Sequence, residues 1–340
     1  MRIIVLVFLL FASTYSVSCQ EIEDKQCPVH NDSLINAWLS KNSIPAIGIG
    51  VIKNFHITQI KVYGQLTEGK PAPYNSIFKV ASLTKPVVSM VAMELISKGR
   101  LALDDKLSDY WIDPDIQKNP LHDSLSIKHV LTHQTGFKNW RRFNKNSKLD
   151  FDFNPGTQFQ YSGEGYEYLR EYLERRFNAT IEELSDSLIF KPLGMVDTKF
   201  TWQERIDTSR YALNHDKSGR LIPTVKNMEA NGADHLLSTI EDYCKFGLYV
   251  LKGGFLSEAL YDEMITEQVV INQYSSFGLG WEIVPDFVDG SDVIMHSGSD
   301  PGARSLIVLD PNSGKGIIVF SNSDNGGWGY WDDLIMSSLK

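Results

Sequence analysis

The sequence predicts an α+β fold in which strands from both ends of the chain form one sheet and the helical middle region forms the opposite wall. Two observations support this prediction. Short apolar segments typical of strands occur near both ends of the 340-residue chain, whereas the middle shows helical periodicity. No low-complexity linker divides the chain, so we expect strands from both ends to pair in one sheet.

The first third of the chain is expected to supply a helix, two strands and a long central helix. Apolar residues at helical spacing predict a helix over 31–40. Apolar segments at 46–52 and 57–63 predict two strands. The run 84–98 is apolar at helical spacing, and Gly99 ends it.

The middle of the chain is expected to be mainly helical. A short helix is predicted over 126–132, and amphipathic helices are predicted over 163–177, 181–188 and 240–251. Between them, segment 139–154 is polar, irregular and rich in aromatic residues. Such a loop often lines a functional site, although a surface excursion with local packing is the alternative.

The last quarter of the chain returns to the strand pattern. Apolar segments predict strands over 277–284, 293–295, 305–309 and 316–320. A final helix is predicted over 330–339, where it would pack on the sheet.

Composition excludes some classes of function. Hydrophobic residues make up 42% of the chain and charged residues 22%, which is enough for a large core. The net charge is −9 and the longest basic run is only 138–142, so we expect no nucleic-acid partner. Cysteine and histidine residues are not spaced as zinc ligands, so neither a metal nor another cofactor is predicted.

The N-terminus predicts export. One positive charge at Arg2 precedes the apolar run 3–12 and the small, polar segment 13–18, so 1–19 is interpreted as a signal peptide and 29–340 as the folded domain. Cleavage before Cys19 and lipid attachment at Cys19 both stay open. The protein is therefore expected in the periplasm or lipid-anchored to the cell envelope, with Cys19 as its only membrane contact.

The chain has three cysteines, Cys19, Cys27 and Cys244. Cys27 and Cys244 would be able to pair in an oxidising compartment. The interpretation favoured here is that Cys244 is a small core residue, because it lies on an apolar helix face.

The stretch FKVASLTKP places Ser82 between strand-like residues and the central helix. Lys85 follows three residues later, on the same helix face. A neutral amine there would take the Ser82 proton, and free N–H groups at the helix start would stabilise an oxyanion. The alternative is a capping serine with an exposed lysine. Ser76 and Lys79 share this spacing, but Ser76 precedes the strand-like residues, whereas Ser82 lies where they meet the helix.

Tyr161 in FQYSGEGY is the candidate proton relay. A nearby ammonium would lower the pKa of its phenol, and the phenolate would act as a general base and later return the proton to the leaving group. The alternative is a buried core tyrosine.

His296, Ser297, Gly298 and Ser299 follow apolar strand residues and form the candidate substrate-binding strand. Glycine in an edge strand allows a ligand to approach the backbone. His296 would hydrogen-bond a carbonyl or carboxylate, and the Ser299 N–H would be a second oxyanion donor beside that of Ser82. The alternative for His296 is a polar residue at a strand end.

Together these stretches resemble the serine beta-lactamase-like family, which includes class C beta-lactamases, penicillin-binding D-Ala-D-Ala carboxypeptidases, and related esterases and D-aminopeptidases. FKVASLTK is similar to its S-x-x-K element, YSG stands at its Y-x-N, and HSG at its K-T-G or H-T-G. LTHQTG, KPLGMVDTKF, LLSTIEDYCKFG and HSGSDPG recur in the expected order, so the resemblance covers about 31–340. It implies the family's antiparallel sheet and helices, with an acyl-enzyme on Ser82, activation by Lys85 and proton relay by Tyr161.

Two positions depart from the family pattern. Gly163 replaces the asparagine of the second motif, which removes an amide that contacts the acylamide side chain of the substrate. His296 replaces lysine, which removes a fixed cation, since histidine is only partly charged near neutral pH. Arg304 is either a replacement cation or a structural arginine.

The sequence therefore predicts an exported serine hydrolase that cleaves an ester or amide of a small-molecule or peptide-like acyl substrate. Two alternatives stay open. One is a catalytically weak or inactive recognition or sensor domain of the penicillin-binding type, which Gly163 favours. The other is a true beta-lactamase.

Overall fold

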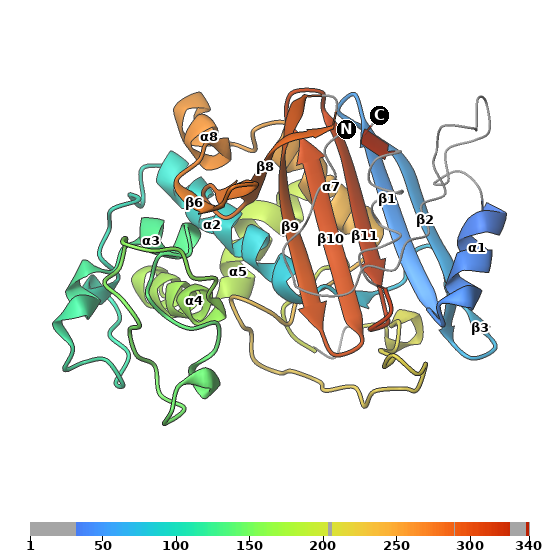
Figure 1. The fold of residues 1–340 in the computed structure, drawn as a ribbon, viewed down its shortest axis with the longest axis horizontal. Helices are drawn as coiled ribbons and strands as arrows, with labels where there is room; N and C mark the ends of the chain where they lie inside the picture. The colour runs from blue at the N-terminus through green and yellow to red at the C-terminus, as the bar shows by residue number, and fades with distance from the viewer. Residues whose placement is uncertain (1–31, 203–205, 289, 327–337, 340) are drawn as a thin grey trace.

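A nine-stranded antiparallel sheet organises the part of the chain that the computed structural model describes, residues 32–202, 206–288, 290–326 and 338–339. Its strand order is β3-β2-β1-β11-β10-β9-β8-β7-β6 (Figure 1). The strands are β1 (Ala46–Lys53), β2 (His56–Thr67), β3 (Lys70–Pro71), β6 (Val269–Asn272), β7 (Ser275–Phe277), β8 (Glu282–Val288), β9 (Ser291–Asp300), β10 (Ala303–Asp310) and β11 (Lys315–Ser321).

The first and last parts of the chain meet in the middle of this sheet. β1 pairs with β11, with Ile47 opposite Ser321 and Ile52 opposite Gly316. The predicted α+β fold, with an antiparallel sheet flanked by helices, is therefore confirmed.

Helices cover both faces of the sheet and build the inserted region, which lies beyond β6–β8 in Figure 1. The helices are α1 (Asp32–Lys41), α2 (Thr84–Ser97), α3 (Ile127–Leu131), α4 (Gly163–Phe177), α5 (Ile181–Ser185), a π-helical turn (Asp186–Phe190), α6 (Lys191–Leu193), α7 (Ile240–Leu251) and α8 (Glu258–Ile265). Short 3-10 turns occur at Ala81–Leu83, Leu107–Asp109, Pro120–Ser124, Arg141–Phe143 and Thr208–Arg210. No helix among these described residues has the length and apolar character needed to cross a bilayer.

α7 packs closely on the sheet because β1 carries glycines beneath it. A Cβ on Gly48 would lie 2.4 Å from Ile240 Cγ1, and one on Gly50 would lie 2.0 Å from Cys244 Sγ. Cys244 is fully buried with a free thiol, and burial raises its pKa. This agrees with the prediction of a core cysteine, while Cys19 and Cys27 lie outside the described residues.

Three predicted segments need correction. The strand predicted over 277–284 is a pair, β7 and β8, because Gly280 adopts a φ of 88° between them and reverses the chain. The strand predicted over 293–295 extends to Asp300, because its pairing with β10 continues to the end. The apolar approach to Ser82 forms only the two-residue β4 (Phe78–Lys79), which pairs with β5 (Leu237–Ser238) outside the main sheet.

The described elements that were not predicted include α8 and β6, together with the short elements β3, β5 and α6. The helix predicted over 330–339 lies outside the described residues except for 338–339. The predicted signal peptide, residues 1–19, also lies outside them.

Candidate active site

Ser82 lies in the 3-10 turn Ala81–Leu83, directly before α2. Ala81 adopts a φ of 48°, a left-handed conformation that costs energy for a residue with a side chain. The turn is held on the sheet side, since Ser305 Oγ donates a hydrogen bond to the Val80 carbonyl at 2.7 Å. Ser82 is thereby presented from a fixed backbone rather than from a flexible loop.

Lys85 is one helical turn beyond Ser82, as its spacing predicted. Its Nζ donates hydrogen bonds to Ser82 Oγ and to the Ala233 carbonyl, each at 3.0 Å. The side chain is fully buried, and burial lowers its pKa to about 7, although the Asp234 carboxylate opposes that shift. A large fraction of Lys85 is therefore an uncharged amine near neutral pH.

The second Ser-Lys match does not form a pair. Ser76 Oγ donates to the Pro73 carbonyl at 2.6 Å, and Lys79 makes ion pairs with Asp234 and Asp300. Of the two matches, only Ser82 and Lys85 are in hydrogen-bond contact.

Tyr161 lies against both residues. Its ring centroid is 4.7 Å from Lys85 Nζ, and its hydroxyl is hydrogen-bonded to the Ser82 side chain. The expectation of a lowered phenol pKa is wrong. Burial of the phenol raises its pKa, and this effect outweighs the hydrogen bond with Ser82, which acts in the opposite direction. Tyr161 is a phenol, not a phenolate, in the free protein.

His133 supports Tyr161 and was not predicted as a site residue. Its ring centroid lies 4.3 Å from that of Tyr161 and 4.8 Å from that of Phe277. Its Nδ1 accepts a hydrogen bond from the Ser162 N–H at 3.0 Å. Burial lowers its pKa well below the ordinary value, so it is neutral. The only sequence signal was its place in the stretch LTHQTG.

His296 lies on β9 and closes another side of the site. Its ring centroid is 6.1 Å from that of Tyr161, and its Nδ1 lies 2.9 Å from the Ser297 carbonyl. Burial and the nearby Lys85 lower its pKa to about 3. His296 is therefore neutral near neutral pH, rather than partly charged as expected.

At Gly298, β9 runs close to the turn Ala81–Leu83 that carries Ser82. A Cβ there would lie 2.5 Å from the Val80 carbonyl oxygen and 3.1 Å from the Ser82 nitrogen. Only glycine allows this approach. The next residue, Ser299, is exposed at the end of the strand.

Gly163 is the first residue of α4, and the side chain of another residue fills the space beside it. A Cβ on Gly163 would lie 2.8 Å from Trp140 Cη2, so the indole occupies the space into which a side chain would extend. Asn139 Oδ1 accepts a hydrogen bond from the Gly163 N–H at 2.8 Å. Loop 139–154 therefore covers this side of the site.

Arg304 is a structural arginine. Its guanidinium pairs with Asp324 at 2.8 Å and also donates to the Asp300 and Ala303 carbonyls at 2.7 Å. These bonds occupy the guanidinium, so Arg304 does not replace the cation that His296 lacks.

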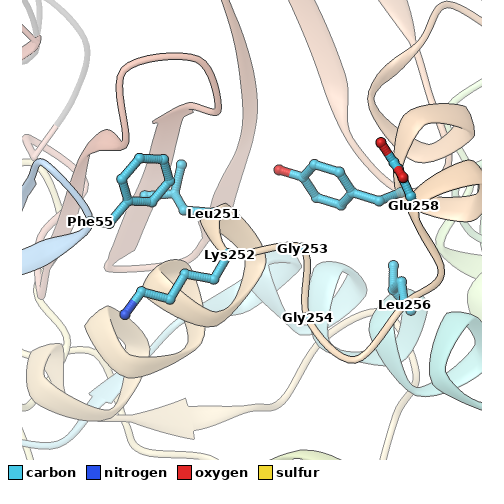
Figure 2. Close-up of a pocket in the computed structure, with 8 residues that line it drawn as sticks. Phe55, Leu251, Lys252, Gly253, Gly254, Leu256 and Glu258 are labelled. Atoms are coloured by element: carbon cyan, nitrogen blue, oxygen red, sulfur yellow. The ribbon is translucent and has the colours of Figure 1, made fainter.

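A hollow of about 430 Å³ at the C-terminal end of α7 is separate from these residues (Figure 2). It is lined by Phe55, Leu251, Lys252, Gly253, Gly254, Leu256, Glu258 and Tyr261. None of the predicted site residues lines it. Among the described residues, no three His, Cys, Asp or Glu side chains gather as metal ligands would.

The fold is that of penicillin-binding proteins. The octameric penicillin-binding protein homologue from Pyrococcus abyssi superposes with a TM-score of 0.77 at 24% identity, over 91% of this chain and 75% of that chain. The penicillin-binding protein from Bacillus halodurans superposes with a TM-score of 0.73 at 20% identity, over 88% and 96% of the respective chains.

Sequence comparison then identifies the family. The family model described as Beta-lactamase matches residues 31–338, and the chain belongs to this family. Penicillin-binding protein 4* of Bacillus subtilis is 24% identical over 77% of this chain and 64% of its own length. Protein flp of Staphylococcus aureus is 23% identical over 86% of this chain and 62% of its own length. The chain thus spans a little under two thirds of these two relatives.

Proposed function

We propose that this protein is an exported serine hydrolase that cleaves an ester or amide bond through an acyl-enzyme on Ser82. One observation carries the proposal. A buried amine with a pKa of about 7 lies 3.0 Å from a serine hydroxyl on a fixed turn. This combination makes Lys85 a general base matched to neutral pH.

In the acylation step, the Lys85 amine accepts the proton of Ser82 as Oγ attacks the substrate carbonyl. The oxyanion forms next to the N–H groups of Ser82 and Ser299, which act as its donors. Tyr161 then protonates the leaving group from its hydroxyl and regains a proton from the Lys85 ammonium. The leaving group thus departs with the Tyr161 proton, and the proton lost by Ser82 is passed through Lys85 to restore the Tyr161 hydroxyl.

Deacylation repeats these roles with water in place of Ser82. Water loses a proton to the Lys85 and Tyr161 pair and attacks the acyl carbonyl, and Ser82 recovers its proton as the ester bond breaks. Neutral His296 and His133 keep the Tyr161 ring in place without adding charge.

The substrate is proposed to be a small ester or a peptide-like acyl donor. Gly163 lacks the amide that would hold an acylamide group, and Trp140 fills its place. His296 is neutral and Arg304 is engaged with Asp324, so neither offers a cation for the carboxylate of a beta-lactam. These features argue against an efficient beta-lactamase. Export, with release to the periplasm or lipid anchoring at Cys19, remains a proposal from the first 19 residues.

The test combines labelling and turnover with purified protein. A fluorophosphonate probe and a labelled penicillin are expected to modify the wild type but not Ser82→Ala. Ser76→Ala is the matched control, because it removes the serine of the other Ser-Lys match and should label normally. A panel of esters, D-amino-acid peptides and beta-lactams then identifies the substrate class. Equal labelling of Ser82→Ala and the wild type would overturn the proposal.

A second candidate function is recognition without turnover. The indole over Gly163 favours it, because it removes a substrate contact from the site. This candidate predicts that ligands raise the unfolding temperature while the whole panel stays unhydrolysed. Hydrolysis that is lost in Tyr161→Phe would reject it.

A further inference from the structure

Lys79 holds together two segments that each contribute to the site. It lies in β4, three residues before Ser82. Its ammonium makes an ion pair with the Asp300 carboxylate and lies 3.9 Å from Asp234 Oδ2. The exposed fractions of the three side chains are 18% for Lys79, 26% for Asp300 and 16% for Asp234, so water screens these charges only partly. These three residues are called the Lys79 cluster below.

Each carboxylate of the cluster follows a backbone group that the proposed reaction uses. Asp234 comes directly after Ala233, whose carbonyl binds Lys85 Nζ at 3.0 Å. Asp300 comes directly after Ser299, the proposed oxyanion donor, at the end of β9. The segment at 233–234 and the end of β9 are far apart in sequence, and the ammonium of Lys79 bridges them.

The rest of the site depends on both segments keeping their positions. Ala233 fixes one of the two hydrogen bonds of Lys85, and the other goes to Ser82. Without the ammonium, two carboxylates that face the same point would repel each other. The segments would then move apart, and the amine and the oxyanion donor would lose their alignment with Ser82.

We propose that Lys79 is a positioning residue that ties segment 233–234 to the end of β9 and so aligns Lys85 and the Ser299 N–H around Ser82. This inference rests on the proposed hydrolase function. Lys79 itself touches no reacting atom, so its effect is expected in kcat more than in KM.

The cluster also sets the charge that Lys85 experiences. The titratable groups that face Lys85 come from several elements, namely Tyr161, Tyr166, His133, His296 and Asp234. Of these, Asp234 favours the ammonium form of Lys85. Loss of Lys79 leaves Asp234 without its counter-ion, so the pKa of Lys85 should rise and more of the amine should be protonated at neutral pH.

The test compares Lys79→Met, Lys79→Arg and Asp300→Asn with the wild type. Lys61→Met is the matched control, because it removes an exposed ion pair between Lys61 on β2 and Asp32 on α1. Loss of alignment by about 1 Å costs on the order of 100-fold, so kcat for an activated ester should fall by about 10- to 100-fold in Lys79→Met. Lys79→Arg should stay within about threefold, because its guanidinium can bind two carboxylates. Lys61→Met should match the wild type.

A second readout does not require turnover. NMR of isotope-labelled lysine side chains follows the titration of Lys85, which should shift to higher pH in Lys79→Met and return towards the wild-type value in Lys79→Met/Asp234→Asn.

A wild type that hydrolyses nothing would overturn the proposed function, whereas an unchanged Lys85 titration in Lys79→Met would overturn the role of Lys79. If Lys79→Met does not fold, Asp300→Asn decides. A wild-type kcat in that variant rejects the inference, and a reduced kcat in a folded protein supports it.

Discussion

Lys85 shows how burial alone changes the chemistry of a residue. In water its amine would be charged at neutral pH, but the fully buried side chain has a pKa of about 7. Tyr161 responds to the same environment in the opposite sense, because burial favours the neutral form of both an amine and a phenol. The result is that, near neutral pH, the phenol of Tyr161 is neutral and a large fraction of Lys85 is an uncharged amine.

This pKa predicts the pH dependence of kcat/KM. Lys85 must be unprotonated to act as a base, so kcat/KM should fall about tenfold per pH unit below a pKa of about 7 and level off above it. The raised pKa of Tyr161 predicts no loss near the ordinary tyrosine pKa. The measurement is kcat/KM for an activated ester from about pH 5 to about pH 11, a range that includes the ordinary tyrosine pKa of about 10.

His296 supplies the control for this pH profile. Its pKa is about 3, so the midpoint of the acid limb should be unchanged in His296→Gln even if the rate falls. A limb that disappears in His296→Gln would assign it to the imidazole and contradict the role of Lys85.

At the scale of the element, the contact between β1 and α7 determines how closely α7 packs on the sheet. Gly48 and Gly50 leave the space that Ile240 and Cys244 of α7 occupy. α2 is buried from Thr84 to Leu95, so it depends on its neighbours, including α7, on every side. The proposed base Lys85, which lies on α2, therefore takes its position from packing of this kind.

Gly50→Ala tests the contact. The new methyl group would lie 2.0 Å from Cys244 Sγ, and overpacking of this kind should lower the free energy of unfolding by about 1–3 kcal/mol. The Cys244→Ala change removes the sulfur, so the double variant Gly50→Ala/Cys244→Ala should recover much of the loss. Urea denaturation of both single variants and the double variant measures the coupling. Purely additive losses would show that the two residues do not compete for the same space.

At the scale of the whole molecule, the fold depends on joining the two ends of the described chain. Asn322, which follows β11, is buried at this join. Its Oδ1 accepts a hydrogen bond from the Ala46 N–H at 2.8 Å, and its Nδ2 donates to the Leu213 carbonyl at 2.8 Å. One side chain thus connects the start of β1, the end of β11 and the segment before α7.

Asn322→Ala is therefore expected to destabilise the whole protein. It removes the partner of the buried Ala46 N–H and of the partly buried Leu213 carbonyl, which should lower the free energy of unfolding by about 2–4 kcal/mol. Asn312→Ala, at an exposed position, should change it by less than about 0.5 kcal/mol. Thermal and urea unfolding measure both variants. Equal stability of the two variants would mean that contacts other than those of Asn322 hold β1 and β11 together.

Local spacing was sufficient to predict much of this protein. A separation of three residues in a helix brings Ser82 and Lys85 together, and the strand and helix patterns predicted that strands from both chain ends form one sheet beside a helical wall. These features depend on neighbours in the sequence, so the sequence pattern contains them. The turn at Gly280 escaped prediction because an apolar run does not show where it reverses.

Other features depend on residues that only the tertiary structure brings together. The indole over Gly163, the bridge from Lys79 to Asp234 and Asp300, and the packing of His133 on Tyr161 all join distant segments. The tertiary structure also determines the direction in which the pKa values of Lys85, Tyr161 and His296 shift. A pKa depends on how much water surrounds a group, and burial is a property of the whole fold rather than of a motif.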